Sequence, residues 1–189
     1  RGVENEMRRN ETRLRALISV LQHPAESIQE YLDFALAEAL KLTGSKLGYI
    51  YHYFEDRRQF VLNTWSRDVM KECTIADPAT VYDLDKTGIW GETVRQRRPI
   101  RVNDFAAAHP LKKGYPEGHV ALEKFMTIPV FSGDRIVAVV GLANRQADYA
   151  EADVRQLQLL MDGVWKIVRQ RELEKEQLQL MSAIEQASE

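Results

Sequence analysis

The 189-residue chain has one cysteine, Cys73, and this scarcity limits the chemistry it can carry. One cysteine cannot form an intrachain disulfide or a cysteine-cluster metal site. No apolar stretch approaches the roughly 20 residues that a membrane helix needs. Residues 1–10 are charged and show no signal peptide. We therefore expect a cytoplasmic protein without direct membrane contact. Because the sequence does not begin with Met, we also expect it to be part of a longer chain.

An excess of charge of one sign is also lacking. The chain has 26 Lys and Arg residues against 28 Asp and Glu residues, a formal net charge of −2. The basic residues are scattered rather than grouped with aromatic residues, so a nucleic-acid partner is not expected. No nucleophile–base pair, metal-ligand cluster or phosphate-binding glycine loop is evident. The sequence thus predicts a non-enzymatic protein with no catalytic residue and no metal site, and it names no cofactor.

Residues 125–171 have the most informative pattern: strand, tight turn, strand and long helix. Residues 125–131 alternate, and residues 132–135 (Ser-Gly-Asp-Arg) are typical of a turn, so an antiparallel hairpin is predicted. The second strand, residues 136–143, has no polar face, which predicts a sheet covered on both sides. From Ala150 onward a helix is predicted, with an apolar stripe that includes Leu157, Leu160, Val164 and Ile167.

Both ends of the chain have the pattern of projecting helices. Near the N-terminus, spacings of four and three residues define a coiled-coil seam in which Asn10 can fix the register. The seam consists of Val3, Met7, Asn10, Leu14, Leu17 and Leu21. The alternative is one amphipathic helix that lies on its own domain. Near the C-terminus, residues 169–176 are too polar for a core, and apolar spacings resume from Leu178 to Ile184.

The middle of the chain is predicted to alternate between strands and short helices. The expected elements are a helix at 26–42 that ends at Gly44, strands at 47–54, 59–64, 80–84 and 99–102, and a short helix at 88–96. Residues 66–79 are expected to be a loop with a short helix, and residues 103–118 a long surface loop. Terminal helices around a central antiparallel sheet define an α+β domain.

Four stretches within residues 26–171 resemble the GAF domain, a small-molecule-binding module of bacterial sensor kinases, diguanylate cyclases and cyclic-nucleotide phosphodiesterases. The matching stretches are GIWGETV (88–94), PIRVND (99–104), IPV (128–130) and IVAVVG (136–141). KGYPEGH (113–119) is similar to a subgroup found in bacterial multidomain sensors, and MSAIEQASE (181–189) resembles the lead-in to a PAS domain. Pro129 conflicts with the rule that proline avoids central strands, but the family accepts proline there.

The resemblance implies a sheet with the terminal helices on one face and a loop-roofed ligand pocket on the other. Residues 66–79 and 103–120 would form the roof. The candidate ligand-binding residues on or near it are Trp65, Cys73, Trp90, Tyr115 and His119. Aromatic walls with a few polar groups suit a small organic ligand, although these aromatic residues can equally well fill the core.

Two of these candidates have further alternatives. The His119 imidazole can ligate haem iron or bind an anion, against the more common structural or solvent-facing role. Cys73 lies beside Glu72, which does not favour a thiolate, so a buried inert thiol is preferred over a redox sensor. The Cys-His pair of the bilin-binding relatives is missing.

A partial match to cyclic-nucleotide-binding relatives follows the hairpin. Those relatives have Asn-Lys, a Phe, and then an Asp after three intervening residues, where this chain has Asn144-Arg145, Tyr149 and Asp153. Arg145 is expected to pair with Asp153 and to hold the last strand against the final helix. The match permits a cyclic nucleotide without establishing one.

We interpret residues 1–22 as a signalling helix, 23–171 as a GAF-like sensory domain and 172–189 as a connector helix to an output or PAS domain. The hypothesis is a homodimer, joined through its terminal helices, that transmits the state of an unidentified small-molecule ligand to an output domain in the same chain. The alternative is a ligand-free dimerisation and transmission module.

Overall fold

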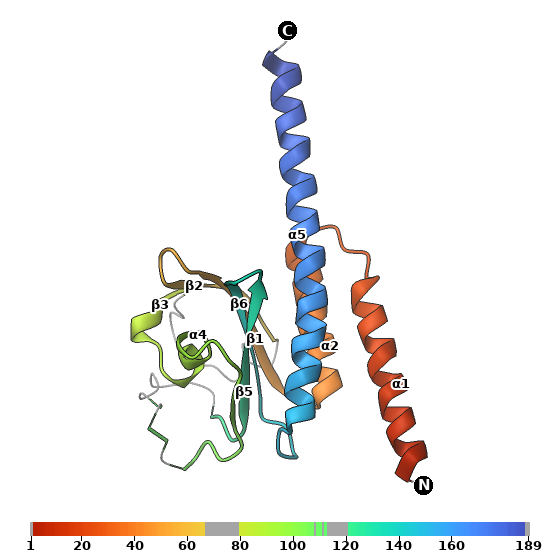
Figure 1. The fold of residues 1–189 in the computed structure, drawn as a ribbon, viewed down its shortest axis with the longest axis vertical. Coiled ribbons are helices and arrows are strands. Elements are labelled where there is room, and N and C mark those ends of the chain that lie inside the picture. Colours follow the sequence, from red (N-terminus) through yellow and green to blue (C-terminus); the bar gives the residue numbers. More distant parts are fainter. Residues whose placement is uncertain (1, 67–79, 108, 111, 113–120, 188–189) are drawn as a thin grey trace.

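The computed structural model describes residues 2–66, 80–107, 109–110, 112 and 121–187. Its centre is a six-stranded antiparallel sheet in the order β3-β2-β1-β6-β5-β4, with helices on one face (Figure 1). The predicted α+β class is therefore confirmed. The strands are β1 (Leu47–Phe54), β2 (Gln59–Trp65), β3 (Val81–Asp83), β4 (Ile100–Val102), β5 (Phe125–Ser132) and β6 (Arg135–Ala143). The helices are α1 (Gly2–Leu21), α2 (Ile28–Thr43), η1 (Leu84–Lys86), η2 (Ile89–Gly91), α4 (Glu92–Arg95) and α5 (Glu151–Ala187).

The predicted hairpin is β5–β6, and its turn contains Gly133 at a φ of 59°, a conformation that favours glycine. Pro129 lies inside β5 and pairs with Val139 of β6. On the other side of β5, β4 pairs only with residues 125–127. Pro129 therefore lies beyond the end of the neighbouring strand, at a position where a missing N–H is tolerated.

One face of the sheet is covered by α2 and α5. Ser27 caps the N-terminus of α2 by accepting a hydrogen bond from the Glu30 N–H, and Gly44, at a φ of 67°, ends the helix as predicted. Between the two helices and the sheet lies the largest apolar cluster, which includes the predicted stripe residues Leu157, Leu160 and Val164. Every second residue of β6 points into this layer, so one side of that strand is fully buried.

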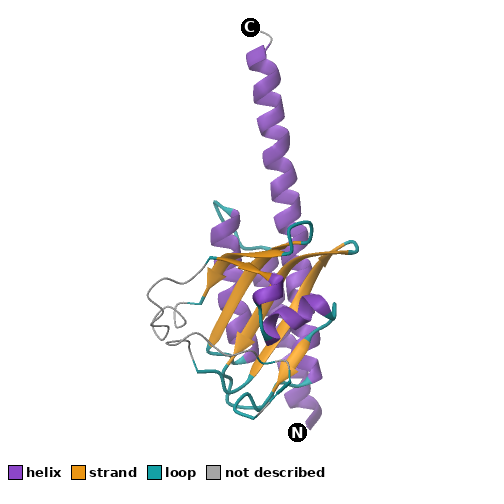
Figure 2. Cartoon of the chain, turned by 90° about the vertical axis from the view of Figure 1, so that its left-hand side faces the viewer, coloured by secondary structure: helices purple, strands orange, loops and turns teal. Residues whose placement is uncertain are grey.

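The opposite face of the sheet, here called the distal face, is covered by the segment of residues 84–96, here called the cover segment, whose short helices lie in front of the strands in Figure 2. The sequence predicted one short helix at 88–96, but the structure contains η2 followed by one turn, α4. Gly91 lies so close to Thr87 that a Cβ at position 91 would be 1.8 Å from the Thr87 Oγ1. A side chain at position 91 would therefore clash with Thr87, so the close packing of this segment depends on glycine. The cover segment is therefore part of the layer that the sequence predicted over the second face of β6.

The two terminal helices project from the domain in different ways. α5 continues far beyond the sheet, whereas α1 lies beside α2 and α5 (Figure 1). Val3, Met7 and Leu14 of the predicted seam are exposed, but Leu17 packs against the core, and Leu21 contacts Gly163 of α5. The C-terminal half of the predicted seam therefore packs on its own domain, as in the alternative of an amphipathic helix, whereas a coiled coil through the exposed N-terminal half stays a prediction. Because Gly163 has no side chain, α1 packs closely there on its own domain.

Candidate functional site

The distal face carries a cluster of aromatic side chains around Trp90. The ring centroid of Trp90 lies 4.6 Å from that of Phe60, 5.2 Å from Tyr51, 5.7 Å from Tyr82 and 6.1 Å from Tyr49. We call these five residues the aromatic cluster. Three strands supply the four partners, and the cover segment supplies Trp90. Tilted and edge-on ring contacts of this kind each add about 0.5–1.5 kcal/mol beyond the buried area.

Tyr49 reaches across the distal face over a glycine. It is paired with Gly141 of β6, and a Cβ at position 141 would be 2.2 Å from the Tyr49 ring. The Tyr49 hydroxyl donates a hydrogen bond to the Thr127 Oγ1 on β5 at 3.2 Å. Burial raises the pKa of Tyr49 above its usual range, so the hydroxyl stays protonated and remains a donor. The distal face thus holds one polar pair within an apolar surface.

Arg95 holds the cover segment in place. Its guanidinium donates to the carbonyl oxygens of Leu84 at 2.8 Å, Thr87 at 3.1 Å and Gly88 at 2.9 Å. It also forms an ion pair with Glu92 of the same helical turn. One side chain therefore satisfies three carbonyl groups of a segment that has little regular structure. Because Trp90 lies within this segment, Arg95 also fixes the position of the aromatic cluster.

Two of the five predicted site residues lie in the described structure. Trp90 is at the centre of the aromatic cluster, and Trp65, at the end of β2, packs at the edge of the same apolar layer. Tyr49 lies opposite Trp65 in the β1–β2 ladder. The three other candidates, Cys73, Tyr115 and His119, lie outside the described residues, as do 67–79 and most of 111–120 of the expected roof. Tyr49 and Thr127 were not identified from the sequence.

The described part of the second expected loop is tied down by its own contacts. The Asn103 amide donates to the carbonyl of Tyr149 at 3.1 Å and accepts from the Tyr149 N–H at 2.8 Å. The Lys112 ammonium donates to the carbonyl oxygens of Phe105 and Ala107 and lies 4.3 Å from the centre of the Phe105 ring. Lys112 therefore already has partners within the loop.

The partial match at residues 144–153 has a structural role. Arg145 and Asp153 form the predicted ion pair at 2.6 Å, with both side chains mostly buried. Asp153 also accepts from the Ala150 N–H at 2.7 Å at the start of α5. Asn144, at a φ of 59°, donates to the Ala121 carbonyl and accepts from the Glu123 N–H. Tyr149 bonds Ser45 at 2.7 Å, and burial raises its pKa to about 12.

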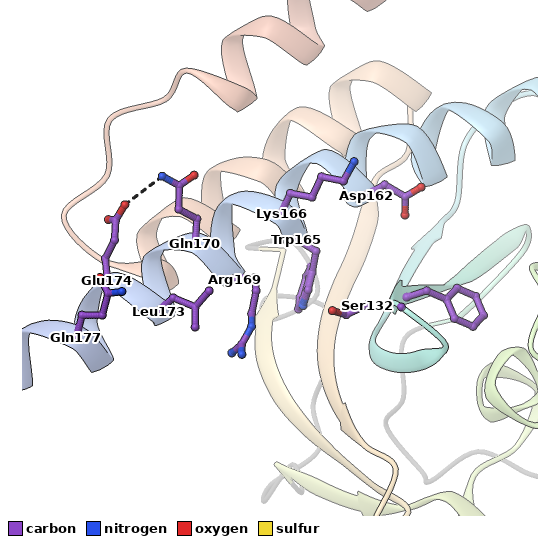
Figure 3. Close-up of a pocket in the computed structure, with 11 residues that line it drawn as sticks. Ser132, Asp162, Trp165, Lys166, Arg169, Gln170, Leu173, Glu174 and Gln177 are labelled. Carbon is purple, nitrogen blue, oxygen red and sulfur yellow. Dashed lines mark hydrogen bonds between the residues drawn. The ribbon is translucent and has the colours of Figure 1, made fainter. Parts of the chain in front are cut away.

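A groove of about 640 Å³ lies on the other side of the molecule, where α5 leaves the domain (Figure 3). One wall is the tip of the β5–β6 hairpin, and the other is a face of α5. Trp165 forms an apolar surface within it, beside Lys166 and Arg169, while Leu173 lies farther along the helix (Figure 3). We call it the α5 groove. Nothing in the sequence indicated it, because the hairpin tip meets the helix only in the folded chain.

The described residues contain no group of three or more His, Cys, Asp or Glu side chains placed to hold a metal ion. Within that same part of the chain, no helix is both long enough and apolar enough to cross a membrane.

A family model described as the GAF domain matches residues 25–169, which is more than half of the chain. The chain therefore belongs to the GAF domain family. It is also 48% identical over 167 residues to the methyl sulfide methyltransferase-associated sensor of Methanosarcina acetivorans. That match covers 88% of this chain but only 17% of the relative. The family and this sensor-named relative support a sensory or regulatory role.

Solved structures share the fold at low sequence identity. The GAF domain of a phosphoenolpyruvate-protein phosphotransferase from Coxiella burnetii has a TM-score of 0.69 and 15% identity, over 86% of this chain and 96% of that one. The free methionine-R-sulfoxide reductase from Neisseria meningitidis, in complex with its substrate, has a TM-score of 0.64 and 16% identity, over 86% and 91%. These likenesses show the fold alone, and the second shows that the fold also occurs in an enzyme.

Proposed function

We propose that this chain is a non-catalytic sensory GAF module that binds a small molecule on the distal face and transmits the ligand state through its terminal helices. The observation that carries the proposal is the 48% identity to a sensor protein over 88% of the chain. Binding would bias the relative pose of the helices in a homodimer, provided that the ligand prefers one pose. The output domain, in a longer cytoplasmic chain, would be a histidine kinase or diguanylate cyclase, with a PAS domain next along the chain.

The distal face supplies one wall of the proposed pocket. Trp90 and Tyr49 offer ring surfaces, and the Tyr49–Thr127 hydroxyl pair offers a polar group for orientation. The other wall would come from residues 66–79 and 103–120, which include the candidates Cys73, Tyr115 and His119. A catalytic role is not proposed, because the chain has a single cysteine and the reductase branch of this fold uses several.

The alternative function is a ligand-free dimerisation and transmission module. The observation in its favour is the aromatic cluster itself, because Trp90 already has four ring partners within 6.1 Å. In that case the distal face would be a packed core and the helices alone would transmit the signal.

The two functions are distinguished by measuring retained small-molecule mass and dimer fraction together in native mass spectra. For a sensor, we expect the wild-type protein to retain a small molecule, with a Soret band in the visible spectrum if the molecule is haem. Trp90→Leu and His119→Ala should lose that mass but keep the dimer. Met7→Asp with Leu14→Asp, at exposed α1 positions, should lose the dimer but keep the mass. A wild-type spectrum without additional mass would contradict the sensor and favour the alternative.

A further inference from the structure

The part of α5 beyond the domain carries an apolar line that continues from the α5 groove. Leu173 and Leu180 are separated by seven residues, and their exposed fractions are 43% and 64%. Leu173 lines the groove, and Leu180 lies one heptad farther along the exposed helix. Seven-residue repetition keeps apolar side chains on one side of a helix, which is the pattern of a coiled-coil seam.

This line lies on a different side of α5 from the residues that are buried in the core of its own domain. The residues of α5 that face the sheet and α2 are Leu157, Met161, Val164 and Val168. At 100° per residue they point about 140° away from the line of Leu173 and Leu180. A second helix can therefore contact the line without displacing the core of the domain. Figure 1 shows α5 projecting alone past the end of the sheet.

Two charges flank the line on opposite sides within the groove. Arg169 precedes Leu173 by four residues and Glu174 follows it by one, which are the g and e positions when Leu173 is at d. In a parallel two-stranded coiled coil, a g residue lies beside the e residue of the following heptad on the partner helix. Arg169 of one helix would thus face Glu174 of the other, twice per dimer, as complementary charges.

The a positions of this register are polar near the groove. Gln170 and Gln177 line the groove on either side of Leu173. Figure 3 shows the hydrogen bond from Gln170 to Glu174. Arg169 lies on the other side of the helix. Polar residues at a reduce stability but select register and a two-stranded assembly. The combination of leucine at d, glutamine at a and opposite charges at g and e suits a weak, parallel, in-register pair.

We propose that the α5 groove and the line from Leu173 to Leu180 bind α5 of a second copy of this chain, in parallel, with Arg169 and Glu174 pairing between the copies. This inference rests on the proposed dimeric transmission and adds its register. The pairing would begin beside the β5–β6 hairpin tip, where the groove begins. A movement of the sheet would then reach the paired helices through the hairpin.

Charge reversal tests the pairing between copies. Arg169→Glu alone and Glu174→Arg alone each place like charges across both contacts, so the dissociation constant of the dimer should rise by about tenfold or more in each. An equimolar mixture of the two variants restores two attractive contacts, so a heterodimer should form with near wild-type affinity. Sedimentation equilibrium of each variant and fluorescence transfer between labelled variants measure both quantities. Variants that dimerise as well alone as in the mixture would overturn the proposal.

A cysteine scan tests the geometry independently of charge. Leu180→Cys, at d, should form a disulfide-linked dimer under mild oxidation. The matched control Gln179→Cys is equally part of the exposed helix but points away from the line. In a parallel pair its two sulfur atoms would lie too far apart for a disulfide, so it should cross-link at least about fivefold more slowly than Leu180→Cys. Oxidation of the wild-type chain under the same conditions measures the background cross-linking through Cys73. Equal rates at both positions, or cross-linking of Leu14→Cys in place of Leu180→Cys, would overturn the register.

The outcome is separable from that of the proposed function. If the charge and cysteine tests fail while native mass spectra still show a retained small molecule, the sensor stands and the α5 register is wrong. If both tests succeed and no small molecule is retained, the register stands and the transmission module replaces the sensor.

Discussion

Gly141 lies directly opposite Tyr49 in the β1–β6 ladder, and the Tyr49 ring occupies the space that a Cβ at position 141 would need. The arrangement of side chains on the distal face therefore requires glycine at position 141. Without it, the Tyr49 hydroxyl cannot reach Thr127, and the ring cannot lie beside Trp90.

Gly141→Ala should destabilise the domain by about 1–3 kcal/mol, because the added methyl group overpacks a strand at the centre of the sheet. Urea unfolding followed by tryptophan fluorescence measures the change. Gly2→Ala is the matched control, since nothing lies within 4 Å of its Cβ position, and it should have little effect. An unchanged unfolding midpoint for Gly141→Ala would show that the tyrosine moves away at no cost.

Arg95→Met should loosen the cover segment. It removes three hydrogen bonds to the carbonyl oxygens of Leu84, Thr87 and Gly88 and should cost about 2–3 kcal/mol. The effect should be concentrated in residues 84–96, where amide hydrogen exchange should accelerate. Arg98→Met, at an exposed position three residues after α4, is the control. Equal exchange rates in the two variants would contradict the role given to Arg95.

Asp153→Ala removes both the ion pair with Arg145 and the acceptor for the Ala150 N–H. Since Arg145 is then left mostly buried without its counter-charge, we expect a loss of about 2–4 kcal/mol. Glu151→Ala, whose contacts with Arg101 and Arg155 are 4.0 Å long and exposed, should change stability by less than about 0.5 kcal/mol. Thermal unfolding of both variants provides the comparison, and equal losses would refute the assignment.

His52 makes stability depend on pH near neutrality. It lies between the sheet and Trp165, and burial lowers its pKa below the ordinary value, an effect that Glu172 partly opposes. The unfolded chain therefore binds a proton more readily than the folded one, so this contribution is complete above about pH 6.5 and is lost as the pH falls below it.

The matching variant is His52→Gln, which keeps a polar group for Asn63 but does not titrate. The difference in unfolding free energy between wild type and His52→Gln should shrink as the pH falls from 7.5 to about 5.5. Glu55 and Asp83 have lowered pKa values and lose their contributions only at more acidic pH. A constant difference over this range would contradict the assignment to His52.

Local patterns in the sequence were sufficient for much of the fold. The β5–β6 hairpin was predicted because its turn residues and apolar runs are adjacent, and the Gly44 helix end because left-handed backbone favours glycine. The Arg145–Asp153 pair was also confirmed, since both residues flank the start of α5. Each of these features depends on residues close together along the chain.

The remaining features depend on contacts between distant segments. Leu17 has the spacing of a free seam, but its burial is decided by α1 packing beside α5. Tyr49 was missed because its role depends on Gly141, 92 positions later in the printed sequence (141 − 49). The α5 groove joins a hairpin tip to a helix, and no spacing rule brings those together.

The most direct test of the account is the distance between the two α5 helices in the presence and absence of the ligand. A nitroxide on an unnatural residue at position 179 avoids Cys73 and lies on the exposed part of α5. Pulsed dipolar spectroscopy is then recorded on the dimer with its co-purified small molecule, after the molecule is removed, and after it is added back. The account predicts a reversible shift of the distance distribution between the two states. An identical distribution in all three samples would contradict the transmission of ligand state through the terminal helices.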